Sequence, residues 1–144
     1  MNIAVIFIQG TLVLDQVKLI SLSSVVDSRG VLTAIEGTKD IPFEIKRVFY
    51  MHHIKRDRGG HAHRDTDQVV IAISGSFTVE LFDGKEYKHF DMNDPTQGLY
   101  VPRMIFITMD NFTPQSVCLV LANCFYDMSR SFRSKDDYLN FLRK

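Results

Sequence analysis

The sequence predicts an all-β fold, a jelly-roll β-barrel that ends in a short C-terminal helix. Short apolar segments alternate with turn signals along most of the chain, and Asp83-Gly84 is a typical hairpin turn. No convincing amphipathic helix precedes the last dozen residues or so, and closing many short strands into a barrel removes exposed sheet edges. With 144 residues and no linker or repeat, residues 1–144 are expected to form a single domain.

The expected strands follow one another at roughly even spacing, and β-branched and aromatic residues are frequent in them. They cover Val17–Val25, Val31–Glu36, Ile45–Ile54, Gln68–Ser74, Ser76–Phe82, Glu86–Phe90, Leu99–Pro102, Ile105–Met109 and Ser116–Asn123. Residues 55–60 are expected to form a charged loop. Near the end of the chain, Ser134–Asp137 offers an N-cap for a helix over Tyr138–Leu142.

The first segment, Met1–Leu14, is apolar, but it lacks a basic start and a small-residue cleavage site and is too short to span a bilayer. We interpret it as an edge or dimer-interface strand of a cytoplasmic homodimer. The formal net charge of +0 argues against nucleic acid or an anionic membrane as the main partner. Cys118 and Cys124 are expected to be reduced and packed in the core.

The residues most informative about chemistry lie in Arg58–His63, with the sequence RGGHAH. His61 and His63 are two positions apart on an expected strand, so their side chains share one face, and in a barrel that face should point inward. Two inward imidazoles are costly to bury unless a polar cavity, a metal or a substrate contacts them. Taken alone, the pair could equally be structural, with its nitrogens satisfied by backbone carbonyls.

His61, His63, Gln68 and Gly75 resemble the first motif of the cupin superfamily, in which a glutamate stands where this chain has Gln68. The stretch that resembles the second motif, Val101–Phe106, has no histidine. Two imidazoles and an amide make a poor site for a divalent metal. We therefore predict a cupin without metal or other cofactor, in which the histidines are free to transfer protons.

Six segments then occur in an order typical of one family: Arg29–Gly37, Ile41–Tyr50, Arg58–His63, Gln68–Val69, Asp94–Tyr100 and Val120–Asp127. Together they resemble the dTDP-sugar 3,4-ketoisomerases, which are related to the sugar 3,5-epimerases. The resemblance implies conversion of dTDP-4-dehydro-6-deoxy-D-glucose to a dTDP-3-dehydro-6-deoxyhexose. An aminotransferase would then make a 3-amino sugar for lipopolysaccharide such as O-antigen, for S-layer glycans or for antibiotics.

The implied reaction suits the residues, because the C3 hydrogen lies next to the C4 ketone. An imidazole with a reference pKa of about 6.5 can remove this hydrogen once the enediolate is stabilised. We assign that role to His61, while His63 would protonate an oxygen or hold the ring. The residues expected to bind the substrate are Arg29, Arg47, Tyr50, Arg58 and Gln68, although Arg29 and Arg58 could also be solvated loop charges.

Three other functions stay open: a 3,5-epimerase on the same substrate, a metal-binding cupin, and a cupin that binds a sugar without catalysis. The configuration of the product at C4 depends on the face from which that carbon is reprotonated. Arg29 favours the galactose-configured product. Ile107, at a position where a polar residue is expected in relatives, weakens that preference.

Overall fold

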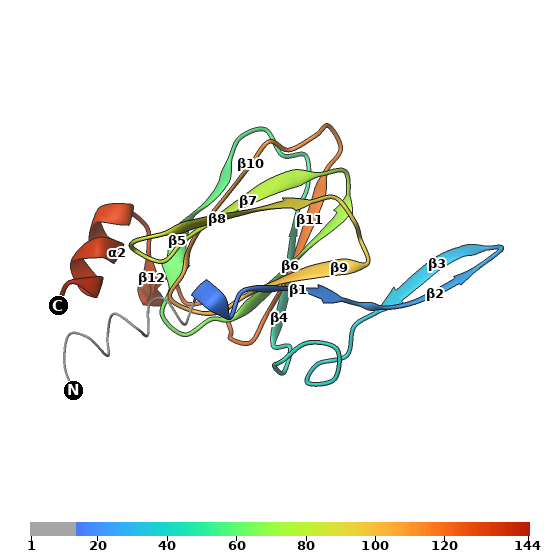
Figure 1. Ribbon diagram of the computed structural model, residues 1–144, viewed down its shortest axis with the longest axis horizontal. Helices are drawn as coiled ribbons and strands as arrows, with labels where there is room; N and C mark the ends of the chain where they lie inside the picture. The colour runs from blue at the N-terminus through green and yellow to red at the C-terminus, as the bar shows by residue number, and fades with distance from the viewer. Residues whose placement is uncertain (1–13) are drawn as a thin grey trace.

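Two five-stranded antiparallel sheets form the barrel in the computed structural model, which describes residues 14–144 (Figure 1). The sheets have the strand orders β1-β9-β6-β11-β4 and β12-β5-β10-β7-β8, and a separate hairpin joins β2 to β3. This confirms the predicted all-β jelly-roll class with a short C-terminal helix. Residues 1–13, where an interface strand was predicted, lie outside the described residues.

The first sheet contains β1 (Lys18–Ser21), β9 (Gln97–Val101), β6 (Gln68–Ser74), β11 (Val117–Ala122) and β4 (Arg47–Met51). The second contains β12 (Ser131–Phe132), β5 (Arg58–His63), β10 (Phe106–Asp110), β7 (Phe77–Phe82) and β8 (Tyr87–Met92). The hairpin of β2 (Ser23–Asp27) and β3 (Gly30–Ala34) projects from one end of the barrel, while helix α2 (Lys135–Leu142) lies at the opposite end (Figure 1).

The observed strands depart from the predicted ones in two places that matter for function. The predicted strand 17–25 is divided at Leu22, which is buried and whose backbone N–H donates to the Thr96 carbonyl. The residues after this division leave the barrel as the hairpin. The predicted loop 55–60 is wrong at its end, because β5 begins at Arg58, which pairs with Met109 of β10.

The main core lies between the two sheets beside the cavity described below, and β6 is the central strand of the first sheet. Val70 and Ala72 point inward and share a cluster with Ile107 of β10. Val69 and Ile71, on the other face of β6, belong to a second cluster with residues of the loop before β4, among them Ile41 and Phe43. Because both faces of β6 are buried, its sequence is a continuous apolar run rather than an alternating one.

Helix α2 begins three residues earlier than predicted, because the Ser134 hydroxyl caps it by accepting from the Asp137 backbone N–H at 3.1 Å. Tyr138 is fully buried, and its hydroxyl donates to the Met104 carbonyl at 2.7 Å. The helix thereby holds the segment before it, which includes β12, against β5.

Both cysteines are free thiols, but only Cys118 lies in the core. Cys124 was predicted to be buried as well, and it is instead half-buried with its thiol donating to the Asp65 carbonyl at 3.3 Å. Among residues 14–144, no helix has the length and apolar character needed to span a membrane.

Candidate active site

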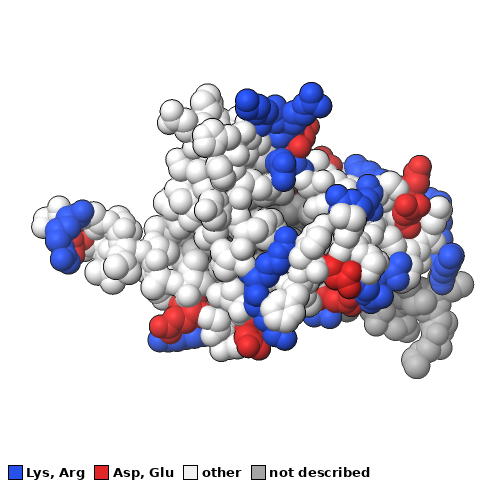
Figure 2. Space-filling model, turned by 180° about the vertical axis from the view of Figure 1, so that it is seen from behind, with Lys and Arg blue, Asp and Glu red and all other residues white. Residues whose placement is uncertain are grey.

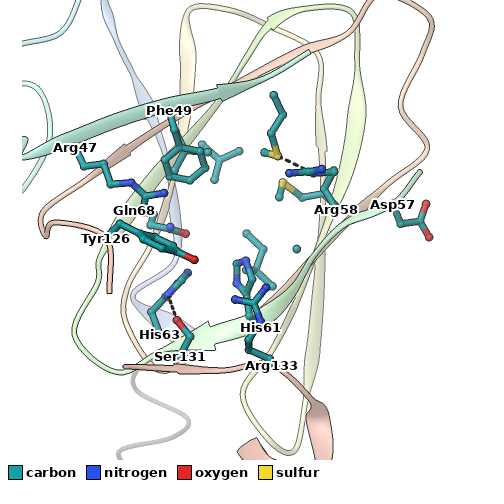
Figure 3. Close-up of a pocket in the computed structure, with 16 residues that line it drawn as sticks. Arg47, Phe49, Asp57, Arg58, His61, His63, Gln68, Tyr126, Ser131 and Arg133 are labelled. Carbon is teal, nitrogen blue, oxygen red and sulfur yellow. Dashed lines mark hydrogen bonds between the residues drawn. The ribbon is translucent and has the colours of Figure 1, made fainter. Parts of the chain in front are cut away.

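A cavity of about 420 Å³ lies between the two sheets and receives side chains from both of them (Figure 3). Strands β4, β6 and β11 line one side, and strands β5 and β10 line the other. Part of the wall is apolar and includes Val70, Ile107 and Val120. The polar side chains that face the cavity are Arg47, Asp57, Arg58, His61, His63, Gln68, Tyr126, Ser131 and Arg133.

The strand β5 brings His61 and His63 to the same face, as strand alternation requires. Their ring centroids are 4.6 Å apart, and both rings line the cavity (Figure 3). Just before them, Gly59 has a φ of +86°, and a side chain there would place its Cβ 2.7 Å from the Ile107 carbonyl oxygen. A glycine is therefore needed for β5 to approach β10 closely at the point where the histidines enter the cavity.

One nitrogen of each imidazole is buried without a hydrogen-bonding partner among the described residues: Nδ1 of His61 and Nε2 of His63. The other nitrogen of His63, Nδ1, lies 3.0 Å from the Ser131 hydroxyl. A buried polar atom without a partner is costly, and native proteins rarely retain one without a functional reason. These two nitrogens belong to residues that line the cavity, and they leave hydrogen-bonding positions open that suit a polar ligand.

The surroundings favour the neutral form of both rings. Burial is the main cause that lowers the pKa of His61 below its ordinary value, and the positive charge of Arg133 contributes. Burial also lowers the pKa of His63 to about 4, with further contributions from His61 and Arg47. Both imidazoles are therefore neutral near pH 7, and each has one nitrogen that can accept a proton.

Positive charge dominates the cavity, because Arg47, Arg58 and Arg133 line it together with one carboxylate, Asp57. In Figure 2, basic side chains border a hollow on the face shown. The Arg47 guanidinium lies between two aromatic rings, 4.3 Å from the Phe49 centroid and 4.7 Å from the Tyr126 centroid. The Arg58 Nε contacts the Met51 sulfur at 3.2 Å. Such a cavity suits an anionic ligand.

Five predicted site residues lie together in this cavity: His61, His63, Arg47, Arg58 and Gln68. Gln68, at the position where cupins have a glutamate, is only 4% exposed and points into the cavity (Figure 3).

The two other predicted residues lie outside the cavity. The Tyr50 side chain is on the opposite face of β4 and is exposed. Arg29 lies at the tip of the β2–β3 hairpin, with its side chain 88% exposed and 2.7 Å from the Asp27 carboxylate. Within this chain, neither residue can reach the histidines.

Four polar residues of the cavity were not predicted from the sequence: Asp57, Tyr126, Ser131 and Arg133. Asp57 lies just before β5, in the stretch that was predicted to be a charged loop. The other three follow β11 in a segment without regular periodicity, which returns to the barrel only when β12 pairs with β5. Because β12 and β5 are far apart in the sequence, no local sequence pattern predicts that they pair. The motif that ends in Tyr126 and Asp127 was the one available indication that this part of the chain contributes to the site.

The positions that usually hold a cupin metal ion do not suit one here. They offer two imidazoles and the Gln68 amide, and the stretch of the second motif supplies no further histidine. Within residues 14–144, no group of three or more His, Cys, Asp and Glu side chains is arranged to hold a metal. Neutral amides are weak ligands for the transition metals that such sites bind.

The jelly-roll barrel, with two histidines of one strand facing its cavity, places this protein in the cupin class. Residues 15–143 match the FdtA family, described as WxcM-like, C-terminal. The chain is 38% identical over 129 residues to a TDP-4-oxo-6-deoxy-alpha-D-glucose-3,4-oxoisomerase of Aneurinibacillus thermoaerophilus, covering 88% of this chain and 93% of that protein. The protein described here is therefore a member of the FdtA family of sugar 3,4-ketoisomerases, and an isomerase.

Solved structures of 3,4-ketoisomerases are also similar to this chain in sequence and in fold. One is a histidine-to-asparagine variant of the 3,4-ketoisomerase QdtA from Thermoanaerobacterium thermosaccharolyticum with TDP-4-keto-6-deoxyglucose. It is 38% identical, with a TM-score of 0.85 over 88% of this chain and 94% of that one. Another is the TDP-quinovose 3,4-ketoisomerase WlaRB from Campylobacter jejuni, 40% identical, with a TM-score of 0.82 over 87% and 98% of the two chains.

A more distant likeness supports the fold alone. The dTDP-4-dehydrorhamnose 3,5-epimerase of Bacillus anthracis is 14% identical to this chain, with a TM-score of 0.71 over 81% of this chain and 77% of that one. The barrel is thus shared with this epimerase, and a shared fold alone does not establish a shared reaction.

Proposed function

We propose that the protein converts dTDP-4-dehydro-6-deoxy-D-glucose to a dTDP-3-dehydro-6-deoxyhexose by proton transfer through His61 and His63. The observation that carries this proposal is the pair of buried imidazoles, 4.6 Å apart, each with an unpartnered nitrogen inside a cavity lined by arginines. The names of the A. thermoaerophilus and T. thermosaccharolyticum relatives support the same substrate and the same type of reaction.

In the first half of the reaction, neutral His61 takes the proton from C3. The electrons of the C3–H bond form a C3–C4 double bond, and those of the C4 carbonyl move to its oxygen. The resulting enediolate is stabilised by a hydrogen bond from His63 and by the nearby guanidinium charges. Because a carbon acid beside a ketone is weak, the base and the oxyanion contacts must act together.

In the second half, O4 gains a proton and O3 loses one, so that a carbonyl forms at C3 while C4 takes a proton from the protonated base. The product is an isomer of the substrate, and no oxidant or reductant is consumed. Two imidazoles on one face provide the donor and the acceptor that these steps need.

Substrate binding would depend mainly on the charged side chains of the cavity. Arg47, Arg58 and Arg133 provide guanidinium groups for the diphosphate and for the developing negative charge. The buried Gln68 amide would hydrogen-bond to the sugar. Arg29 and Tyr50 stay as predicted substrate contacts, but within this chain they lie outside the cavity.

We further propose that the protein is a homodimer in which the β2–β3 hairpin of one protomer packs on the other. Val25, Val26, Val31 and Leu32 of this hairpin are each more than half exposed, which is unfavourable for an isolated hairpin. In such a dimer, Arg29 at the hairpin tip would approach the partner's cavity and favour the galactose-configured product. The next enzyme would be an aminotransferase in the synthesis of a 3-amino sugar for a surface glycan such as lipopolysaccharide.

NMR of the reaction with dTDP-4-dehydro-6-deoxy-D-glucose tests the proposal. We expect the ketone to move from C4 to C3 and the coupling constants of H4 to report the galacto configuration. A product that keeps its C4 ketone and is inverted at C3 and C5 would instead identify a 3,5-epimerase. Binding without turnover would identify a non-catalytic sugar-binding cupin. The gluco configuration would refute only the stereochemical part of the proposal.

Metal analysis with and without chelator treatment tests the metal-binding alternative. We expect the rate of isomerisation to be unchanged after EDTA treatment, because the donor set at His61, His63 and Gln68 is poor. A near-stoichiometric metal together with loss of activity in EDTA would contradict this.

A further inference from the structure

We propose that Ser131 is a positioning residue that holds His63 in the tautomer with its hydrogen on Nε2. His63 then acts as a neutral hydrogen-bond donor to a reacting oxygen of the sugar. This inference rests on the proposed proton transfer at the histidine pair and assigns the role of each ring within it. His61 is the base, and His63 polarises the oxygen.

The hydrogen bond between Ser131 and His63 determines which nitrogen of the His63 ring bears the hydrogen. The ring has two nitrogens, and Ser131 Oγ lies 3.0 Å from Nδ1, while Nε2 is buried in the cavity without a partner among the described residues. In a neutral imidazole one nitrogen donates and the other accepts. The direction of the bond at Nδ1 therefore determines whether Nε2 presents a hydrogen or a lone pair to the ligand.

The Ser131 hydroxyl is better placed to donate than to accept. Its oxygen has no second hydrogen-bonding partner in the part of the chain that the structure describes. If the hydroxyl accepted from Nδ1, its own hydrogen would lack an acceptor among these residues. If it donates to Nδ1, its hydrogen is used and the imidazole hydrogen lies on Nε2, facing the cavity.

The electrostatic surroundings of His63 suit a donor more than a base. Burial, His61 and the nearby arginines all disfavour a charged ring, and a strongly lowered pKa makes a weak base for a proton on carbon. A neutral imidazole can still donate a hydrogen bond to an oxyanion, and enzymes use such a histidine to polarise a carbonyl. His61 is left as the base of the pair.

Ser131 is fixed by the structure around it rather than held on a free loop. It pairs with His63 in the β12–β5 ladder, and the next residue, Phe132, is buried against Tyr138. The Arg64 guanidinium lies between the Phe132 and Phe141 rings, 4.6 and 4.8 Å from their centroids. The hydroxyl is therefore set by backbone pairing and by the packing of α2.

Nitrogen-15 NMR of the His63 ring in the ligand-free protein tests the tautomer directly. We expect the wild-type spectrum to show hydrogen on Nε2, and Ser131→Ala to give a mixture of tautomers. The same variant should lower kcat about tenfold, the amount that loss of one hydrogen bond of ordinary strength predicts, while KM changes little. Ser131→Thr keeps a hydroxyl and suits a strand, so it should retain the wild-type tautomer and most of kcat.

Ser129→Ala is the matched control, because the Ser129 hydroxyl bonds to Asp127 and does not line the cavity. It should change neither the spectrum nor kcat. A wild-type ring with hydrogen on Nδ1 would overturn the proposal, as would a Ser131→Ala protein that keeps the Nε2 tautomer and full kcat. Both results differ from failure of the proposed function, which the product of the wild-type reaction reveals separately.

Discussion

The protonation state of the two histidines is set by neighbouring arginines as well as by burial. Arg47 is held between Phe49 and Tyr126 at 4.3 and 4.7 Å, and no carboxylate pairs with it in residues 14–144. Stacking fixes the guanidinium without neutralising it, so its charge acts on the imidazoles and on any anionic ligand. The cavity thus keeps its bases neutral while it attracts an anion.

The pH profile of kcat/KM follows from this arrangement. The pKa values of both rings are lowered, so both stay neutral as pH falls below the ordinary imidazole value of about 6.5. We expect kcat/KM to decline only below that value, as the rings become protonated. In Arg133→Met, loss of a positive charge beside His61 should raise the pKa of that ring and move the decline to higher pH.

Steady-state kinetics over a pH series would check this prediction. Arg130→Met is a suitable control, because Arg130 is paired with Asp65 at 2.6 Å and does not line the cavity. The account would be contradicted if the wild-type decline lay above pH 6.5 or if Arg133→Met moved it to lower pH.

At the scale of elements, the close pairing of β5 with β10 positions the histidines in the cavity. The register of this pair shifts between Ile107 and Thr108, opposite the two glycines that precede His61. Gly59 and Gly60 both have positive φ values, +86° and +80°. Only Gly59 is also crowded, since a Cβ there would meet the Ile107 carbonyl oxygen at 2.7 Å, whereas the space beside Gly60 is open.

This difference predicts unequal effects of two alanine substitutions. Gly60→Ala should cost about 1–2 kcal/mol of unfolding free energy, the strain of a left-handed residue. Gly59→Ala should cost more, because β5 must also move away from β10, and this movement should lower kcat by displacing His61. Denaturant unfolding and kinetics of both variants check the prediction, and equal losses of stability and activity would contradict it.

Strand periodicity accounts for what the sequence could predict. Strand β6 runs over Gln68–Ser74 as expected. Alternation along β5 places His61 and His63 on one face. The same alternation along β4 brings Arg47 and Phe49 to the cavity, while Tyr50 faces out. Ser131 and Arg133 could not be found in this way. Their position depends on pairing of the two-residue strand β12 with β5 and on the burial of Tyr138, contacts between distant segments that no local pattern encodes.

At the scale of the whole molecule, the β2–β3 hairpin is the feature that a single chain does not explain. It projects from the barrel with four apolar residues more than half exposed, and the surface between it and the hollow of Figure 2 carries few charged side chains. Association of two copies through the hairpin would bury these residues.

Charged residues on the hairpin should therefore change the oligomeric state. We expect the double variant Val25→Glu and Leu32→Glu, a cross-strand pair, to be largely monomeric and to lose activity, because desolvating two carboxylates opposes association. Sedimentation analysis would measure this. Asn140→Glu, on the exposed side of α2 at the other end of the barrel, should leave the dimer intact. A wild-type monomer, or a double variant that remains dimeric, would rule out the proposed interface.

The central claim is that neutral His61 removes the C3 proton, and exchange of that proton with deuterium measures this step directly. In D2O we expect the wild-type protein to incorporate deuterium at C3 of the substrate and at C4 of the product, because a proton held by His61 exchanges with solvent. His61→Asn should still bind dTDP-4-dehydro-6-deoxy-D-glucose but exchange at least about 100-fold more slowly, the usual effect of removing a general base. Exchange by His61→Asn at close to the wild-type rate would contradict the account.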